Sequence, residues 1–234
     1  MGWYGTKLQK YRHIRAAQPA QNRSMEEIWR QFTEGLMATT WLEFIAVFFG
    51  IASVVFSRME NIWVYPTGLV NTTIYIYLSV VAGLYAEAGV NFYYTVMSII
   101  GWVLWTNKKD GQTALHITRS TRIEWGRSIA FFGACWLVLY FILKRWTDST
   151  VPLADAFASA AAYTGMYLMT RKKLENWLWW IMTNVASIPL YFSKGFVFTG
   201  FQYLVFLVLA MMGYVEWRKK VNLSTGISAT ATPK

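Results

Sequence analysis

The chain has 234 residues, of which 55% are apolar and only 15% are charged, whereas soluble domains carry about 25% charged residues. Aromatic residues account for 18% of the chain. A soluble protein of this size cannot bury so much apolar and aromatic surface. The composition therefore excludes an ordinary soluble domain and predicts a membrane protein, although the formal net charge of +10 still needs an explanation.

Residues 1–40 form a polar N-terminal tail in which we find no secretory signal pattern. Part of this tail, residues 24–39, has the pattern of an amphipathic helix. Ser24 and Glu27 fit a capping box, and Ile28, Phe32 and Leu36 fall on one helical face. We expect this helix to lie in the membrane interface.

Seven apolar stretches follow the tail. They cover residues 41–57, 62–81, 89–105, 128–143, 152–170, 177–193 and 195–214. A bilayer core of about 30 Å needs roughly 17 to 25 helical residues. Of the 34 charged residues, only Glu43 and Asp155 lie in these stretches. The sequence therefore predicts an all-α membrane protein with seven transmembrane helices.

The basic residues lie beside the ends of the predicted spans, where topology determinants and lipid-headgroup anchors are found. This placement explains the net charge without nucleic-acid binding, which would need a basic face on a soluble domain. The connections on the side of the C-terminal tail, with that tail, hold 13 Lys and Arg, and the alternate connections hold 3. We expect a cytoplasmic C-terminus, although the N-terminal tail, with 6 basic residues, argues the other way.

The first three spans resemble the last three. Glu60-Asn61 recurs as Glu175-Asn176 at an offset of 115, and Gly101-Trp102 recurs as Gly213-Tyr214 at an offset of 112. We reconcile the two offsets with a three-residue gap. The prediction is a 3+1+3 arrangement of parallel repeats, the symmetry of SWEET-type carriers. The expected parts are residues 1–40 (tail), 41–105 (first repeat), 106–151 (loops and linker helix), 152–217 (second repeat) and 218–234 (basic, disordered tail).

One face of the sixth span has the residues of a binding site. Trp177, Trp180 and Asn184 follow i, i+3, i+7 spacing, so two indoles and an amide share this face. Such a face suits a flat organic ring with hydroxyl groups, and Asn91 in the third span is a further cavity candidate. The alternative is structural, because Trp at span ends anchors membrane interfaces and polar side chains join helices.

The sequence shows no catalytic or cofactor-binding pattern. Both histidines, His13 and His116, lie in polar connections, and we find no nucleotide loop, nucleophile elbow or metal-ligand spacing. We therefore expect a carrier rather than an enzyme, with no metal or other cofactor and with the lipid bilayer and a small molecule as partners.

Several motifs resemble the PnuC family of vitamin transporters. The similar segments are Trp41-Leu-Glu-Phe, Tyr65-Pro-Thr-Gly, Glu87-Ala-Gly89-Val-Asn91, Gly101-Trp102, Glu175-Asn176-Trp177 with Trp180 and Asn184, and Ile188-Pro-Leu-Tyr191. Together they cover most of the chain from residue 41 to residue 220.

The resemblance implies a homotrimer in the bacterial inner membrane that takes up nicotinamide riboside by facilitated diffusion, after which a cytoplasmic kinase traps the vitamin for NAD biosynthesis. By position, Trp177 and Trp180 would stack on the pyridinium ring. Asn184, Asn91 and Tyr94 would bind its carboxamide or ribose. Many nicotinamide riboside carriers have an amide residue where this chain has Tyr94.

Three alternatives remain open at this point. Relatives that carry thiamine or another vitamin share the scaffold, and thiamine is also a flat cation. A structural or sensory membrane subunit would use the aromatic residues for packing alone. An integral-membrane enzyme would need clustered acids or histidines at the membrane surface, and we find none in the sequence.

Overall fold

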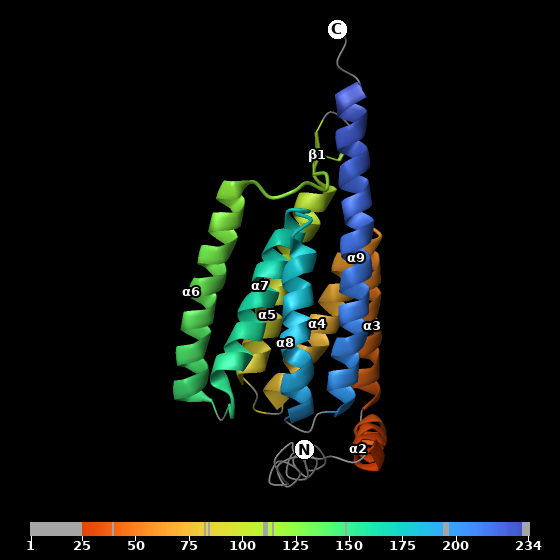
Figure 1. Ribbon diagram of the computed structural model, residues 1–234. Helices are drawn as coiled ribbons and strands as arrows, with labels where there is room; N and C mark the ends of the chain where they lie inside the picture. Colours follow the sequence, from red (N-terminus) through yellow and green to blue (C-terminus); the bar gives the residue numbers. More distant parts are fainter. Residues whose placement is uncertain are drawn as a thin grey trace.

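The structure is a computed structural model that describes residues 25–38, 40–81, 83, 85–109, 112–113, 115–147, 149–193 and 197–230. These residues form eight helices and one short antiparallel hairpin (Figure 1). The elements are α2 (Met25–Ala38), α3 (Trp41–Arg58), α4 (Val64–Val81), α5 (Tyr85–Thr106), β1 (Lys108–Lys109), β2 (Gln112–Thr113), α6 (Arg122–Trp146), α7 (Pro152–Thr170), α8 (Asn176–Ser193) and α9 (Val197–Thr230).

The helix starts follow local sequence signals. Thr40 and Glu43 form a capping box at the start of α3, and Thr121 and Glu124 form another at the start of α6. Helix α7 has proline at its first turn, where the missing N–H costs nothing. Glu43, one of the two charges inside the predicted spans, is thus a capping residue.

By length and composition, four helical segments among the described residues are apolar enough to cross a membrane. They are Trp41–Arg58, Glu87–Thr106, Arg122–Trp146 and Val197–Leu223. Helices α4, α7 and α8 are of similar length but are not among these four. Helix α7 is largely interior, since 11 of its 19 residues are buried.

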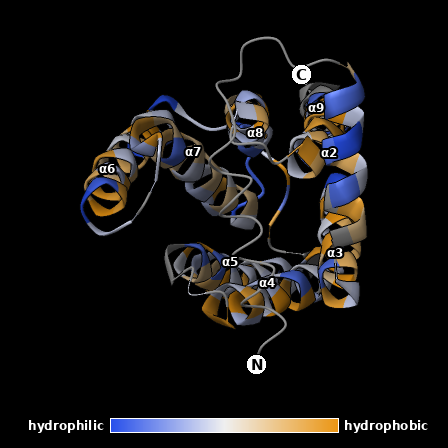
Figure 2. Cartoon of the chain, turned by 90° about the horizontal axis from the view of Figure 1, so that it is seen from below, coloured by the Kyte–Doolittle hydropathy of each residue, from blue (hydrophilic) through white to orange (hydrophobic). Residues whose placement is uncertain are grey.

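Six helices close a ring through their contacts. Helix α3 packs on α4, α4 on α5, α5 on α7, α7 on α8, α8 on α9, and α9 returns to α3. Helix α6 packs against the outer side of α7, as the view along the helices shows (Figure 2). Helix α2 lies at one end and packs on α9, where Phe32 contacts Phe198 and Phe201.

The ring consists of two triplets of helices, α3–α4–α5 (the first triplet) and α7–α8–α9 (the second triplet), whose positions correspond at a spacing of 112 residues. Adding 112 to both bounds of α4 gives both bounds of α8, and the same step takes the start of α5 to the start of α9. The contacts between the triplets correspond as well, because α5 packs on α7 as α9 packs on α3.

The turns after α3 and α7 share their backbone geometry at this spacing. The N–H of Asn61 donates to the carbonyl of Phe56, and the N–H of Lys173 donates to that of Leu168. Glu60 and Lys172 both have positive φ, 60° and 49°. The predicted offset of 115 over the first part of the repeat, with its three-residue gap, is therefore wrong: Glu60 corresponds to Lys172, not to Glu175.

Two aromatic side chains pack on glycines at equivalent places. A Cβ at Gly101 would lie 2.4 Å from the hydroxyl of Tyr65, and a Cβ at Gly213 would lie 2.6 Å from the ring of Trp177. We call the surrounding group the end cluster, and it comprises Tyr65, Trp105, Trp177 and Trp217. It lies at the end of the ring where α3, α5, α7 and α9 approach the β hairpin, the upper end in Figure 1.

The C-terminal boundary differs from the prediction. Residues 218–234 were expected to be a disordered tail, but α9 continues to Thr230, while residues 231–234 lie outside the described residues. One reason for the longer helix is an ion pair. The Lys220 ammonium lies 3.2 Å from the Glu60 carboxylate and ties this part of α9 to the first triplet. Of the N-terminal tail, the structure describes residues 25–38 and residue 40.

Candidate functional site

One face of α8 carries polar and aromatic side chains along the ring. Trp177, Trp180 and Asn184 lie on this face as predicted by their spacing, and Ser187 and Tyr191 continue it at i+3 and i+7 from Asn184. Tyr191 stacks on Tyr203 of α9, with ring centroids 5.0 Å apart and planes 17° apart. The face therefore leads from the end cluster to the opposite end of the second triplet.

Trp177 is the upper member of this face and is 2% exposed. Its indole packs edge-on against Trp217, with centroids 5.6 Å apart and planes 89° apart, and it also contacts Gly213. The ring would have to leave Trp217 before a ligand could stack on it. The structure thus places Trp177 in the end cluster, beside rather than within the group around Trp180.

Trp180 lies one turn further along α8 and meets residues of two other helices. Its ring centroid is 6.3 Å from that of Tyr94 on α5. Tyr94 in turn contacts Tyr163 of α7 at 6.1 Å, and Tyr163 lies 4.2 Å from Tyr93. We call Tyr93, Tyr94, Tyr163 and Trp180 the aromatic cluster. It joins the two triplets in the ring and brings together two of the predicted site residues, Tyr94 and Trp180.

A glycine makes room for Trp180. A Cβ at Gly165 of α7 would lie 3.2 Å from the indole, which is closer than ordinary contact. In the first triplet, Ser53 of α3 corresponds to Gly165 and Gly68 of α4 corresponds to Trp180. The small residue is therefore on α4, where it faces the Ser53 side chain. Only the second triplet therefore has a large aromatic ring at this position, and the ring of helices has one such aromatic group rather than two.

We expect Gly165→Val to weaken ligand binding by about 10-fold or more, because the added isopropyl group displaces the indole that contacts Tyr94. Gly133→Val is the matched control, since a Cβ at Gly133 of α6 meets nothing within 4 Å. Calorimetric titration of both variants with the same vitamin checks the expectation. Equal affinities for the two variants would contradict the placement of the site at Trp180.

Asn184 is buried, with 4% of its surface exposed. Its side-chain amide can both donate and accept hydrogen bonds. Asn184 lies one turn from Trp180 on the same face. The amide is therefore placed to hydrogen-bond a ligand that rests on the indole.

Asn91 is half-buried on α5, and its amide donates to the carbonyl of Glu87 in the same helix, at 3.0 Å. The amide oxygen remains available as an acceptor. Asn91 lies one turn before Tyr94, so the two residues share a face of α5 as the sequence implies.

Sequence reasoning missed Tyr163 as a site residue. Tyr163 lies in the alanine-rich helix α7, and its contact with Tyr94 joins residues 69 positions apart, which no local pattern reveals. Tyr203 of α9 was also missed. Tyr203 stacks on Tyr191, whose place on the α8 face follows from extending the i, i+3, i+7 pattern by one step.

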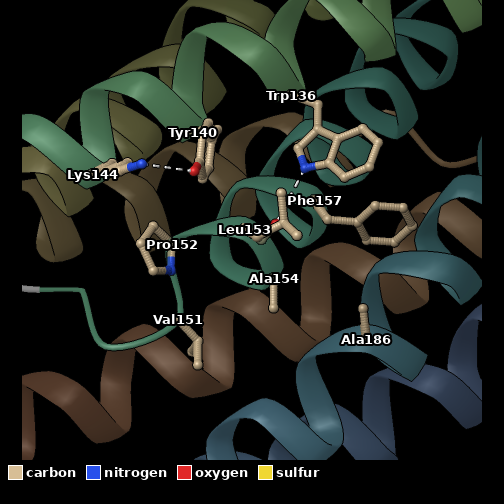
Figure 3. A pocket seen from close by; sticks show the side chains of 9 residues that line it. All are labelled: Trp136, Tyr140, Lys144, Val151, Pro152, Leu153, Ala154, Phe157 and Ala186. Atoms are coloured by element: carbon tan, nitrogen blue, oxygen red, sulfur yellow. Dashed lines mark hydrogen bonds between the residues drawn. The ribbon is translucent and has the colours of Figure 1, made fainter.

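A surface pocket of about 580 Å³ lies away from the predicted site residues (Figure 3). It lies between the end of α6 and the start of α7, and its lining includes Trp136, Tyr140, Leu153 and Phe157. The Trp136 indole donates to the carbonyl of Leu153 at 3.2 Å. Since α6 packs outside the ring, this pocket is peripheral to the aromatic cluster.

The comparisons with known proteins assign this ring of helices to the membrane transporters. A family model described as nicotinamide mononucleotide transporter matches residues 40–219, most of the chain. The chain belongs to this family, the PnuC family of membrane transporters, and is not an enzyme.

Relatives with known assignments carry different vitamins. The chain is 22% identical over 182 residues to the riboflavin/roseoflavin transporter RibM of Streptomyces davaonensis, with 76% of this chain and 84% of RibM covered. It is 21% identical over 208 residues to the nicotinamide riboside transporter PnuC of Escherichia coli, covering 76% and 85%. The identity is 25% over 219 residues to PnuC of Neisseria mucosa, covering 86% and 83%.

A solved structure supports the fold. The crystal structure of the vitamin B3 transporter PnuC superposes with a TM-score of 0.64 and 22% sequence identity, covering 86% of this chain and 94% of the other. At this identity the likeness establishes the shared fold and leaves the choice of vitamin to the site itself.

Proposed function

We propose that the protein takes up nicotinamide riboside across the bacterial inner membrane by facilitated diffusion. The observation that carries the proposal is the contact of Trp180 with Tyr94 across the two triplets, with the buried Asn184 one turn from Trp180 on the same face of α8. A pyridinium ring can stack on Trp180, since aromatic faces attract cations by about 0.5–2 kcal/mol each. The Asn184 amide then binds the carboxamide or a ribose hydroxyl, with Asn91 and Tyr94 as further polar contacts.

The proposed site suits a cation without a phosphate. Helices α4 and α8 contain no charged residue, and the charged residue of α5 is Glu87 in its first turn. A phosphorylated vitamin would need Arg or Lys in the site. Uptake of the unphosphorylated nucleoside leaves its capture to a cytoplasmic kinase, which would keep the inward gradient and supply NAD biosynthesis.

The relatives support a second candidate, a different flat vitamin on the same scaffold. RibM is named for riboflavin and roseoflavin, and thiamine is a flat cation that meets the same stacking requirement. Titration of the purified protein with nicotinamide riboside, thiamine and riboflavin separates these candidates. Binding of none of the three would overturn the proposed function and favour a structural or sensory role.

We further propose that the chain spans the membrane seven times as a 3+1+3 arrangement of parallel repeats, with α6 as the linker and the C-terminus in the cytoplasm. The 112-residue correspondence of α4 with α8 supports the repeat, and α3 and α7 run in the same direction (Figure 1). We place α2 in the interface beside α9. The homotrimer implied by the resemblance is part of the same proposal, and native mass spectrometry in detergent tests it.

Replacing the buried amide tests the hydrogen bond separately from the stacking. We expect Asn184→Ala to weaken binding of nicotinamide riboside by about 5- to 100-fold, the range for a hydrogen bond lost in a buried site. Asn222→Ala is the control, because the Asn222 amide bonds Arg119 at 3.2 Å on the exposed part of α9. An unchanged dissociation constant for Asn184→Ala, measured by calorimetry, would remove Asn184 from the site.

A further inference from the structure

Three contacts at the upper end of the ring join a residue to its own counterpart in the other triplet. The Ser57 hydroxyl contacts Sδ of Met169 at 3.3 Å, and the Lys172 ammonium contacts the Glu60 carboxylate at 2.8 Å. The rings of Trp105 and Trp217 are 6.2 Å apart. Each pair is separated by 112 residues. A residue can touch its own counterpart only near the axis that relates the triplets, so we call these pairs the axial contacts.

The axial contacts are tightly packed. Trp217 is fully buried and Trp105 is 4% exposed. The Trp217 indole donates to the carbonyls of Ser57 and Arg58, at 3.1 Å each, and so holds the end of α3 in the first triplet. The Lys172 ammonium lies 4.6 Å from the centre of the Trp105 ring. Indoles, ion pair and helix ends together fill the axis at this end of the ring.

The filled axis lies next to the proposed site. Trp177 contacts Trp217 on one side and is three residues from Trp180 along α8, a rise of about 5 Å. A ligand on Trp180 therefore has the axial contacts between itself and the upper end of the ring. Passage through this end requires the two triplets to part there.

The chemistry of the axial contacts suits repeated opening. The Glu60 side chain is 23% exposed and lies 3.2 Å from a second cation, Lys220, whereas the Lys172 side chain is only 6% exposed. When the triplets separate, Glu60 keeps Lys220 as a partner and water reaches Lys172, which lowers the cost of breaking the Glu60–Lys172 pair. Glu60 and Lys172 are also held at positive φ, a strained conformation that side chains other than glycine adopt mainly where the surroundings impose it.

We propose that the axial contacts Ser57–Met169, Glu60–Lys172 and Trp105–Trp217 form a gate that closes one end of the carrier and opens when the triplets separate. The gate rests on the proposed transport function for its role. Its opening, however, is a property of the ring that is measurable without substrate.

Cross-linking tests the gate directly, because the sequence has a single cysteine, Cys135, on α6 outside the ring. In a Cys135→Ser background, Ser57→Cys with Met169→Cys places two thiols across the axis. A short, reducible bifunctional thiol reagent should lower flux into proteoliposomes by about 10-fold or more, and reduction should restore it. Binding of the vitamin in detergent should persist, because the site stays accessible from the other end.

A cross-link within one triplet is the matched control. Thr72 and Thr95 join α4 to α5 with hydroxyl oxygens 2.9 Å apart, and linking cysteines there should leave flux unchanged. Unchanged flux after complete Ser57–Met169 cross-linking, verified by mass spectrometry, would overturn the gate. Failure of the unlinked protein to bind or carry any of the three vitamins would instead overturn the proposed function.

A second measurement needs no transport activity. A membrane-impermeant maleimide should label Met169→Cys about fivefold faster when Glu60→Gln removes the ion pair, because the open population rises. Glu124→Gln breaks the neighbouring pair with Lys173, also 2.8 Å, which joins α6 to the same turn and should leave the rate unchanged. Equal labelling rates in the Glu60→Gln and Glu124→Gln backgrounds would contradict the gate.

Discussion

Trp180→Ala is expected to weaken binding of the transported vitamin by about 10- to 100-fold, the range measured when aromatic side chains that stack on flat rings are removed. The indole is the large ring that meets Tyr94 across the junction of the two triplets, and Gly165 leaves room for it. Calorimetric titration with nicotinamide riboside gives the two dissociation constants, and Trp180→Phe should recover part of the loss.

Trp63→Ala is the control for this loss, because Trp63 is 58% exposed in the turn just before α4. Its affinity should equal that of the unchanged protein. Full affinity in Trp180→Ala would mean that the vitamin binds elsewhere in the ring.

Trp217→Ala is expected to have the largest effect on stability, about 3–5 kcal/mol, the range for removing a buried aromatic side chain. The change leaves a cavity between Trp105 and Trp177 and removes the indole donor from the carbonyls at the end of α3. Thermal unfolding in detergent measures the loss as a lower midpoint.

Trp146→Ala provides the comparison for stability, since Trp146 is 75% exposed at the end of α6. Its midpoint should match that of the unchanged protein. If Trp217→Ala also unfolded at the unchanged midpoint, the end cluster would not be a main support of the ring.

The helices could be predicted from sequence because the determinants are local. Apolar stretches of span length and a capping box such as that of Thr40 and Glu43 depend on residues close together in the chain. The position at which α9 ends could not be predicted from local patterns, because the contact of Lys220 with Glu60 joins residues 160 positions apart.

The register of the repeat illustrates a further limit. Matching identical residues paired Glu60 with Glu175, whereas the structural counterpart of Glu60 is Lys172, which it contacts. A charged residue that meets its counterpart across the axis needs a partner of opposite charge, so identity is the wrong signal for Glu60, although the uncharged pair Trp105 and Trp217 keeps it. Residues away from the axis, such as Gly101 and Gly213, keep their identity because each makes the same contact within its own triplet.

The sequence could predict which face of α8 carries the candidate site, but not which residues of other helices meet that face. Helical spacing places Trp177, Trp180 and Asn184 on one face. Spacing cannot show that Trp217 and Gly213 enclose Trp177 while Trp180 meets Tyr94, because those contacts come from α5 and α9. Tyr163 was missed for the same reason, since its partners lie on another helix.

The most direct test of the central claim is uptake of labelled nicotinamide riboside into proteoliposomes without an imposed ion gradient. We expect saturable uptake that stops when the inner and outer concentrations are equal, and its loss in Trp180→Ala. Uptake no faster than in protein-free liposomes, or an unchanged rate in Trp180→Ala, would contradict the assignment of the ring as a carrier for this vitamin through Trp180.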